Sequence, residues 1–121
     1  MAQHNDLGHW GEGIAEQYLQ TKGFDILYRN YQIGRLELDL VARQSPNLLI
    51  IVEVKTRTSD LWQDPIAAVD QKKQRHLIRA GHRLAQRLKT PNLSIRFDLI
   101  SVVGRPSNYQ ISHIEDAFYP F

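Results

Sequence analysis

The runs LELDLVAR, residues 36–43, and LLIIVEVK, residues 48–55, decide the fold of this chain. The first alternates apolar and charged side chains, and the second is an apolar run that ends in charges, so both are typical of β-strands. Between them lies Ser45-Pro46-Asn47, a turn sequence, and the two strands therefore form a predicted hairpin. With the turn centred on Pro46, Asp39 faces Glu53 across the hairpin.

The charges on this hairpin need a partner. The same register places Glu37 opposite Lys55, on the face that carries Asp39 and Glu53. Facing side chains have Cβ atoms about 4.5–5.5 Å apart, and like charges at that spacing destabilise a sheet. A divalent cation between the two acids would reverse this effect. Carboxylate oxygens favour Mg²⁺ or Mn²⁺, and the chain has no cysteine for a thiolate zinc site. A register slip of one residue would instead turn one carboxylate to the other face.

Length and composition limit the class of protein. A chain of 121 residues with 42% hydrophobic residues is enough for one domain, which we expect over residues 9–121 after a flexible tail at residues 1–8. The absence of cysteine favours a reducing compartment. The longest apolar run, residues 48–52, is too short to span a membrane, and the first residues lack the pattern of an export signal. A cytoplasmic protein without a membrane partner is expected.

Positive charge is concentrated in one segment, although the net charge is only +2. No acidic residue occurs between Gln71 and Phe97. That segment holds more than half of the 15 basic residues: Lys72, Lys73, Arg75, Arg79, Arg83, Arg87, Lys89 and Arg96. Such segregation is typical of a surface that binds nucleic acid, although a row of arginines on a helix is also compatible with an ordinary solvated face.

The remaining elements follow from periodicity and capping signals. Helical spacing predicts helices over residues 9–22 and 71–89, with a short helical turn over residues 64–69. Strands are expected over residues 24–31, 94–103 and 109–114 in addition to the hairpin. The resulting order is α-β-β-β-α-β-β. A helix between the third and fourth strands permits a parallel crossover, so we predict an α/β fold with a mixed sheet flanked by helices.

Five ordered blocks of sequence then carry a family resemblance. They are Gly8-x-x-Gly11-Glu12-x-x-Ala15, residues 37–42 (ELDLVA), residues 52–57 (VEVKTR), Val69 followed by residues 73–75 (KQR), and residues 96–100 (RFDLI). With them the chain resembles the YraN-like family of small bacterial proteins. That family is similar to archaeal Holliday-junction resolvases within the PD-(D/E)xK nuclease superfamily. The resemblance implies a restriction-endonuclease-like core.

The resemblance also implies roles for individual residues. Asp39 and Glu53 match the superfamily's metal-binding acids, the backbone carbonyl of Val54 matches a third ligand, and Lys55 matches the active-site lysine. Glu12 matches an acid of the first helix that joins the acidic cluster, although a carboxylate favoured by the helix dipole is an alternative reading. Two departures are the replacement of the superfamily's proline by Leu38 and of a family glycine by Leu36. An ordinary ion pair on a solvated sheet face is the alternative for the acids and lysine.

These observations predict a Mg²⁺- or Mn²⁺-dependent endonuclease that hydrolyses phosphodiester bonds in structured or branched DNA. Basic residues expected to contact the nucleic acid are Lys73, Arg75, Arg79 and Arg57. Trp62 either stacks on a base or packs in the core or an interface. Symmetric cleavage of a junction would call for a homodimer. The alternatives are an inactive nucleic-acid-binding module or scaffold on a nuclease fold, and a structural protein whose basic helix meets an acidic protein.

Overall fold

Strands follow one another across the sheet in the same order as along the chain. The computed structural model describes residues 2–59 and 64–118 and contains a five-stranded sheet in the order β1-β2-β3-β4-β5. The elements are α1 (Ala2–Thr21), β1 (Asp25–Ile33), β2 (Leu36–Ser45), β3 (Leu48–Arg57), the short 3-10 helix η1 (Pro65–Ala68), α2 (Gln71–Leu88), β4 (Ser94–Arg105) and β5 (Asn108–Ile114). Apart from the short η1, this is the predicted α-β-β-β-α-β-β order, and the α/β class is confirmed.

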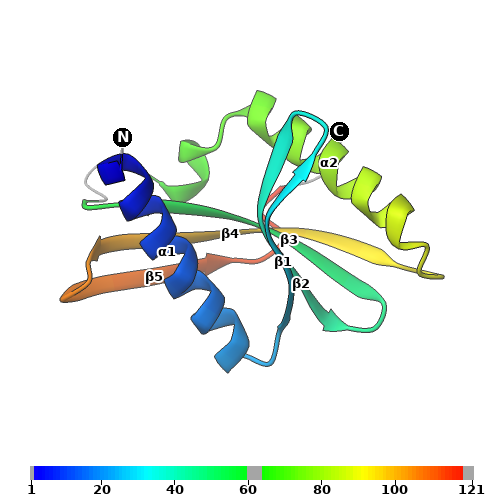
Figure 1. Ribbon diagram of the computed structural model, residues 1–121, viewed down its shortest axis with the longest axis horizontal. Coiled ribbons are helices and arrows are strands. Elements are labelled where there is room, and N and C mark those ends of the chain that lie inside the picture. The colour runs from blue at the N-terminus through cyan, green and yellow to red at the C-terminus, as the bar shows by residue number, and fades with distance from the viewer. Residues whose placement is uncertain (1, 60–63, 119–121) are drawn as a thin grey trace.

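The sheet is mixed, as the crossover predicted. β1, β2 and β3 pair antiparallel, and β5 pairs antiparallel with β4. β3 and β4 pair parallel from Leu48 opposite Ser94 to Arg57 opposite Val103. The connection between them contains α2, because parallel neighbours cannot be joined by a tight turn. Figure 1 shows α1 and α2 on opposite sides of the sheet.

The hairpin register is confirmed over its central part. Leu40 faces Val52 and Arg43 faces Leu49, the pairs that a turn centred on Pro46 requires. The predicted pairing of Glu37 with Lys55 is wrong. Beyond Leu40 the ladder between β2 and β3 ends, and Glu37 instead faces Gln32 on β1, whose side-chain amide donates to Glu37 Oε2 at 3.2 Å.

Helix α1 begins earlier than predicted. It starts at Ala2 rather than His9, so the described part of the expected tail, residues 2–8, is helical. Extending a helix by one more residue costs little once the helix has been nucleated, and no proline precedes His9 to stop it. The predicted end is accurate: Gly23 has a φ of 90°, and the N–H of Phe24 donates to the carbonyl of Leu19 at 3.0 Å.

Each helix covers one apolar face of the sheet. On the face of α2, buried residues of the helix pack with buried residues of β2, β3 and β4: Leu77, Ile78, Ala80, Leu84, Leu38, Val41, Leu49, Ile51, Phe97 and Leu99. On the face of α1, the buried set is Ala15, Leu19, Phe24, Leu40, Ala42, Ile50, Val52, Val54, Ile100 and Val102. Because apolar layers cover both faces, the polar groups that could form a functional site are left at the ends and edges of the sheet.

Strand β2 changes face at Asp39. Leu38 packs on the side of α2 and Leu40 on the side of α1, although residues two apart in a regular strand share a face. The strand therefore turns about its axis at Asp39, which lies where the ladder with β3 ends.

Within the described residues, no helix is long and apolar enough to cross a membrane. Trp62 lies outside the described residues.

Candidate active site

Asp39 and Glu53 come together where β2 leaves β3. The ladder between the strands ends at the pair Leu40 and Val52. One position further, the carboxylate of Asp39 accepts a hydrogen bond from the backbone N–H of Val54 at 2.9 Å. The side chain of Asp39 therefore contacts the backbone of β3 beside Glu53. The predicted pair of acids is present, and the residue predicted to supply a third ligand, Val54, lies directly at Asp39.

Glu53 is a buried carboxylate whose two oxygens have different surroundings. Its side chain is only 4% exposed, and Oε2 lies 3.8 Å from Lys55 Nζ and 3.9 Å from Lys73 Nζ. Oε1 is also buried and has no hydrogen-bond partner among the described residues. A buried carboxylate oxygen without a partner is costly, and such groups in native structures usually mark the position of an ion or a water molecule.

The pKa of Asp39 is raised to about 7, chiefly by burial and next by the negative charge of Glu53, whose side chain approaches the Asp39 carboxyl group closely. The N–H of Val54 acts in the opposite direction by stabilising the carboxylate, as does the positive charge of Lys73. A buried pair of acids in which one stays partly protonated near neutral pH is a typical cation site, because a bound cation offsets both the burial of the charge and the repulsion.

The titration of Asp39 predicts an unusual pH dependence of stability. The carboxyl group ionises near its ordinary pKa of 3.8 when unfolded and near 7 when folded, so the folded state holds its proton more tightly. Without metal, the free energy of unfolding should therefore decrease as the pH rises between these two values. We expect Asp39→Asn to stabilise the metal-free protein on the order of 2 kcal/mol at about pH 8, and to have little effect at about pH 4.

Denaturant unfolding from about pH 4 to about pH 8 measures this effect. The matched control is Asp25→Asn, because Asp25 is an exposed acid at the start of β1, and this variant should follow the wild type. A wild-type protein that is more stable at about pH 8 than Asp39→Asn would contradict the assignment.

Glu12 approaches the acids from helix α1. Its neighbour Gly11 packs so closely on β3 that a Cβ atom at this position would overlap the side chain of Thr56. Glu12 is partly buried, and its Oε1 accepts a hydrogen bond from Asn30 Nδ2 at 3.0 Å. Burial raises the pKa of Glu12, the Asn30 bond lowers it, and the negative charge of Asp39 raises it. Glu12 therefore belongs electrostatically to the acidic cluster.

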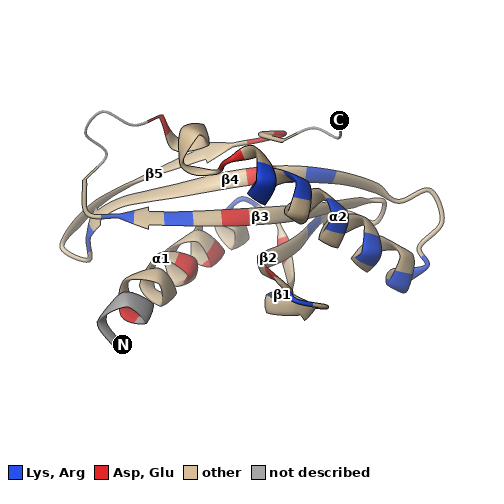
Figure 2. Ribbon diagram, turned by 90° about the horizontal axis from the view of Figure 1, so that it is seen from above, with Lys and Arg blue, Asp and Glu red and all other residues tan. Residues whose placement is uncertain are grey.

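The predicted nucleic-acid residues lie on two sides of the acids. Lys73 is in the first turn of α2, where Asp70 caps the helix, and its ammonium group reaches Glu53. Arg75 and Arg79 are exposed on α2, and Arg57 is partly buried at the end of β3. Figure 2 shows Lys and Arg along α2 and at the end of β3, with acidic positions between them. Basic positions thus lie on either side of the acidic ones in the ribbon.

A second polar cluster was not assigned from the sequence. Asp98 on β4 is fully buried, accepts hydrogen bonds from Arg96 Nε at 2.8 Å and Arg96 Nη2 at 2.9 Å, and lies 2.8 Å from His113 Nε2. Tyr18 OH lies 3.1 Å from His113 Nδ1. For the pair of Arg96 and Asp98, the spacing Arg96-x-Asp98 was the available sequence signal. His113 gave no such signal because it comes from a different strand.

This second cluster is a poor cation site despite its ligands. Asp98, His113 and Glu115 have potential ligand atoms within 4.8 Å of one another. However, Arg96 Nη2 also lies 3.3 Å from Glu115 Oε2, so the guanidinium group already contacts both acids. It supplies the positive charge that a metal would bring, and it would repel one.

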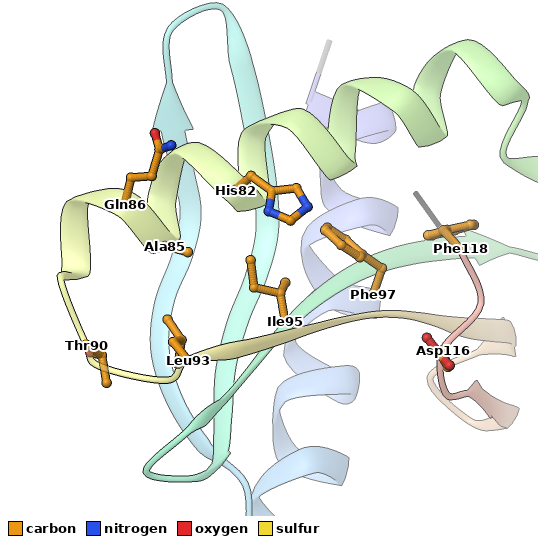
Figure 3. A pocket seen from close by; sticks show the side chains of 9 residues that line it. All are labelled: His82, Ala85, Gln86, Thr90, Leu93, Ile95, Phe97, Asp116 and Phe118. Atoms are coloured by element: carbon orange, nitrogen blue, oxygen red, sulfur yellow. The ribbon is translucent and has the colours of Figure 1, made fainter. Parts of the chain in front are cut away.

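A hollow of about 360 Å³ lies at the far end of α2 (Figure 3). Its lining is largely apolar, with Leu93, Ile95, Phe97 and Phe118, and its titratable residues are His82 and Asp116. It contains neither of the paired acids nor either lysine that contacts Glu53. We therefore place the candidate chemistry at Asp39 and Glu53.

Sequence comparisons agree on one family. The profile of a family described as "Uncharacterised protein family UPF0102" matches residues 11–102. The chain is 44% identical over 120 residues to a UPF0102 protein of Bacteroides thetaiotaomicron, covering 99% of this chain and 98% of the relative. It is 41% identical to one of Flavobacterium psychrophilum over the full length of both. It is also 44% identical to one of Porphyromonas gingivalis, covering 98% of this chain and 87% of that protein.

Proposed function

The chain belongs to the UPF0102 family, whose description names no activity, and from its own residues we propose that it is a divalent-metal-dependent endonuclease. The reaction is hydrolysis of phosphodiester bonds, and the proposed substrate is structured or branched DNA. The branched substrate follows from the resemblance to junction resolvases. The hydrolytic chemistry is supported by the site itself.

The observation that carries the proposal is the buried, unpaired Oε1 of Glu53 next to Asp39. The buried carboxylate of Asp98, by contrast, accepts hydrogen bonds from Arg96 on both of its oxygens. At Glu53 one oxygen faces two lysines at about ion-pair distance, and the other lacks a partner within the described chain. Asp39 keeps a raised pKa beside it. These features fit a cation bound by both acids.

The donor set fits Mg²⁺ or Mn²⁺. Asp39 and Glu53 would hold the ion, with the carbonyl oxygen of Val54 as the third ligand from the protein, and all three offer the hard oxygen atoms that these ions prefer. Bound there, the ion would supply Lewis acidity, which makes water more acidic and screens the negative charge of a phosphate.

The lysines contribute positive charge that the acids hold in place. Lys55 Nζ lies at Glu53 and its side chain is 35% exposed, so the ammonium group can reach both the acid pair and a substrate. We assign Lys55 to stabilise charge that grows on the phosphate oxygens and to orient the attacking water. Lys73, which is 45% exposed, and the exposed Arg75 and Arg79 would bind the DNA backbone.

Metal binding is the first test. We expect Mn²⁺ to bind the wild-type protein in calorimetry and to show no detectable binding to Glu53→Gln, a variant of nearly identical shape. Asp25→Asn and Glu115→Gln should bind as the wild type does, because neither residue lies at the acid pair. Binding that survives Glu53→Gln but is lost in Glu115→Gln would move the metal to the Asp98 cluster and contradict the proposal.

Cleavage is the second test. A four-way junction, a duplex and a single strand are incubated with the wild-type protein and Mn²⁺, with a chelator as the control. Metal-dependent cleavage, strongest on the junction, is expected. Binding of Mn²⁺ without cleavage of any of the three substrates would overturn the endonuclease assignment.

The exposed basic face of α2 supports a second candidate, an inactive nucleic-acid-binding module on this fold. Anisotropy titrations across a salt series distinguish the candidates, because a module would bind DNA with a steep salt dependence and yet leave it intact. In either case, Arg79→Ala should weaken binding to all sequences and reduce the slope of log affinity against log salt by about 1. Arg105→Ala, an exposed arginine on β4, is the matched control.

A further inference from the structure

Asn30 adopts a backbone conformation that is rare within a strand. Its φ is 46°, in the left-handed region, although it lies inside β1. Residues other than glycine seldom adopt this conformation, and asparagine adopts it more readily than most. Such a conformation persists only where the surrounding structure requires it, and it is often found at functional sites.

Asn30 lies at the position of β1 that faces the candidate site. The pairs Arg29 with Leu40 and Tyr31 with Leu38 flank it, so Asn30 lies opposite Asp39. The last pair between β2 and β3 is Leu40 with Val52, so Asp39 and Glu53 each lie one position beyond it. This is also where β2 changes face between Leu38 and Leu40. The left-handed residue on β1 thus coincides with the rotation that brings Asp39 to Glu53.

The side chain of Asn30 reaches the third acid. Its amide donates to Glu12 Oε1 at 3.0 Å. The charged groups that act on Glu12 are His9 on its own helix, and Asp39 and Glu37 on β2. The adjacent Arg29 of β1 is already paired with Glu16. Asn30 therefore gives Glu12 a neutral hydrogen-bond donor.

We propose that Asn30 is a positioning residue of the acidic site. Its left-handed backbone rotates the β1–β2 hairpin at Asp39, and its amide holds the Glu12 carboxylate beside the Asp39 and Glu53 pair. The catalytic consequence rests on the proposed function, whereas the positioning itself can be measured without any activity. Asn30 does not touch substrate and acts through Glu12.

Two substitutions separate the amide from the backbone. Asn30→Gly keeps the left-handed conformation accessible and removes the amide, and Asn30→Asp keeps the size and replaces the donor with a carboxylate. We expect both variants to fold, with a melting temperature for Asn30→Gly within about 3 °C of the wild type. The pKa of Glu12 should rise in Asn30→Gly and rise further in Asn30→Asp, because the amide lowers it and a second negative charge opposes ionisation.

Side-chain NMR titration of Glu12 is the deciding measurement. Asn92→Gly is the matched control: Asn92 also has a positive φ, 56°, but it lies between α2 and β4, so its replacement should leave the pKa of Glu12 unchanged. An unchanged pKa of Glu12 in Asn30→Gly would overturn the positioning role. If the wild type cleaves DNA, Asn30→Gly should cleave about 10-fold more slowly with unchanged Mn²⁺ affinity. Absence of wild-type cleavage would contradict only the activity, since the titration still decides the role of Asn30.

Discussion

Replacement of Lys55 with Ala is expected to lower the rate of Mn²⁺-dependent DNA cleavage by about 10³-fold, while Mn²⁺ affinity changes by less than about threefold. The ammonium group lies 3.8 Å from Glu53 Oε2, next to the proposed ion, but it is not one of the ion's ligands. Its charge matters most when negative charge grows on the phosphate, and preorganised positive charge of this kind contributes about two to three orders of magnitude. The rate and the affinity should therefore respond differently.

Single-turnover cleavage and Mn²⁺ calorimetry on the same preparations measure the two effects. Asp39→Asn provides the contrast, because it removes a ligand and should abolish both binding and cleavage. Lys72→Ala, an exposed lysine next to Lys73, is the control for loss of one positive charge and should cleave within about threefold of the wild type. A Lys55→Ala protein that cleaves as fast as Lys72→Ala would remove Lys55 from the site.

Replacement of Asp98 with Ala is expected to destabilise the protein by about 3–5 kcal/mol. Asp98 is fully buried and is contacted by Arg96, His113 and the backbone N–H of Asp116. Its removal leaves the guanidinium group of Arg96, which is 18% exposed, without its main partner in a low-dielectric environment. The effect should be one of stability and not of metal affinity.

Denaturant unfolding near neutral pH measures this loss. Glu115→Gln is the control, because Glu115 is 56% exposed at the rim of the same cluster and should cost at most about 1 kcal/mol. Burial acts to raise the pKa of Asp98, but hydrogen bonds from His113 and Arg96 outweigh it and lower this pKa overall. The contribution of the charge is therefore present above the ordinary pKa of 3.8 and is lost as the pH falls below it. A loss of less than about 1 kcal/mol in Asp98→Ala would show that the cluster contributes little.

The features that could be predicted from the sequence were those determined by residues close together along the chain. The hairpin register followed from one turn at Pro46, and it brought Asp39 close to Glu53, although these two residues lie just beyond the paired part of the ladder. The cap of α2 at Asp70 and its apolar stripe were likewise visible as short-range patterns. Glu37 was misplaced because strand alternation was assumed to continue through Asp39, where β2 turns over.

The features that were missed depend on contacts between distant segments. Asn30 donates to Glu12 from a distant segment, and the preference of asparagine for the left-handed conformation is too weak to predict that conformation inside a strand. His113 reaches Asp98 and Tyr18 only because β5 pairs with β4 and α1 covers that face. The contact of Lys73 with Glu53 requires the crossover that brings α2 back over the sheet.

The parallel pairing of β3 with β4 has a consequence for the order in which the site is assembled during folding. β1, β2 and β3 are joined by short turns, so their antiparallel ladder closes small loops and brings Asp39 to Glu53. The pairing of β3 with β4 must close a loop that contains all of α2, and contacts of such long range form slowly. We therefore expect the two acids to meet before Lys73 arrives to balance them. A metal ion that binds the partly formed ladder should therefore increase the rate of refolding as well as the stability of the folded state.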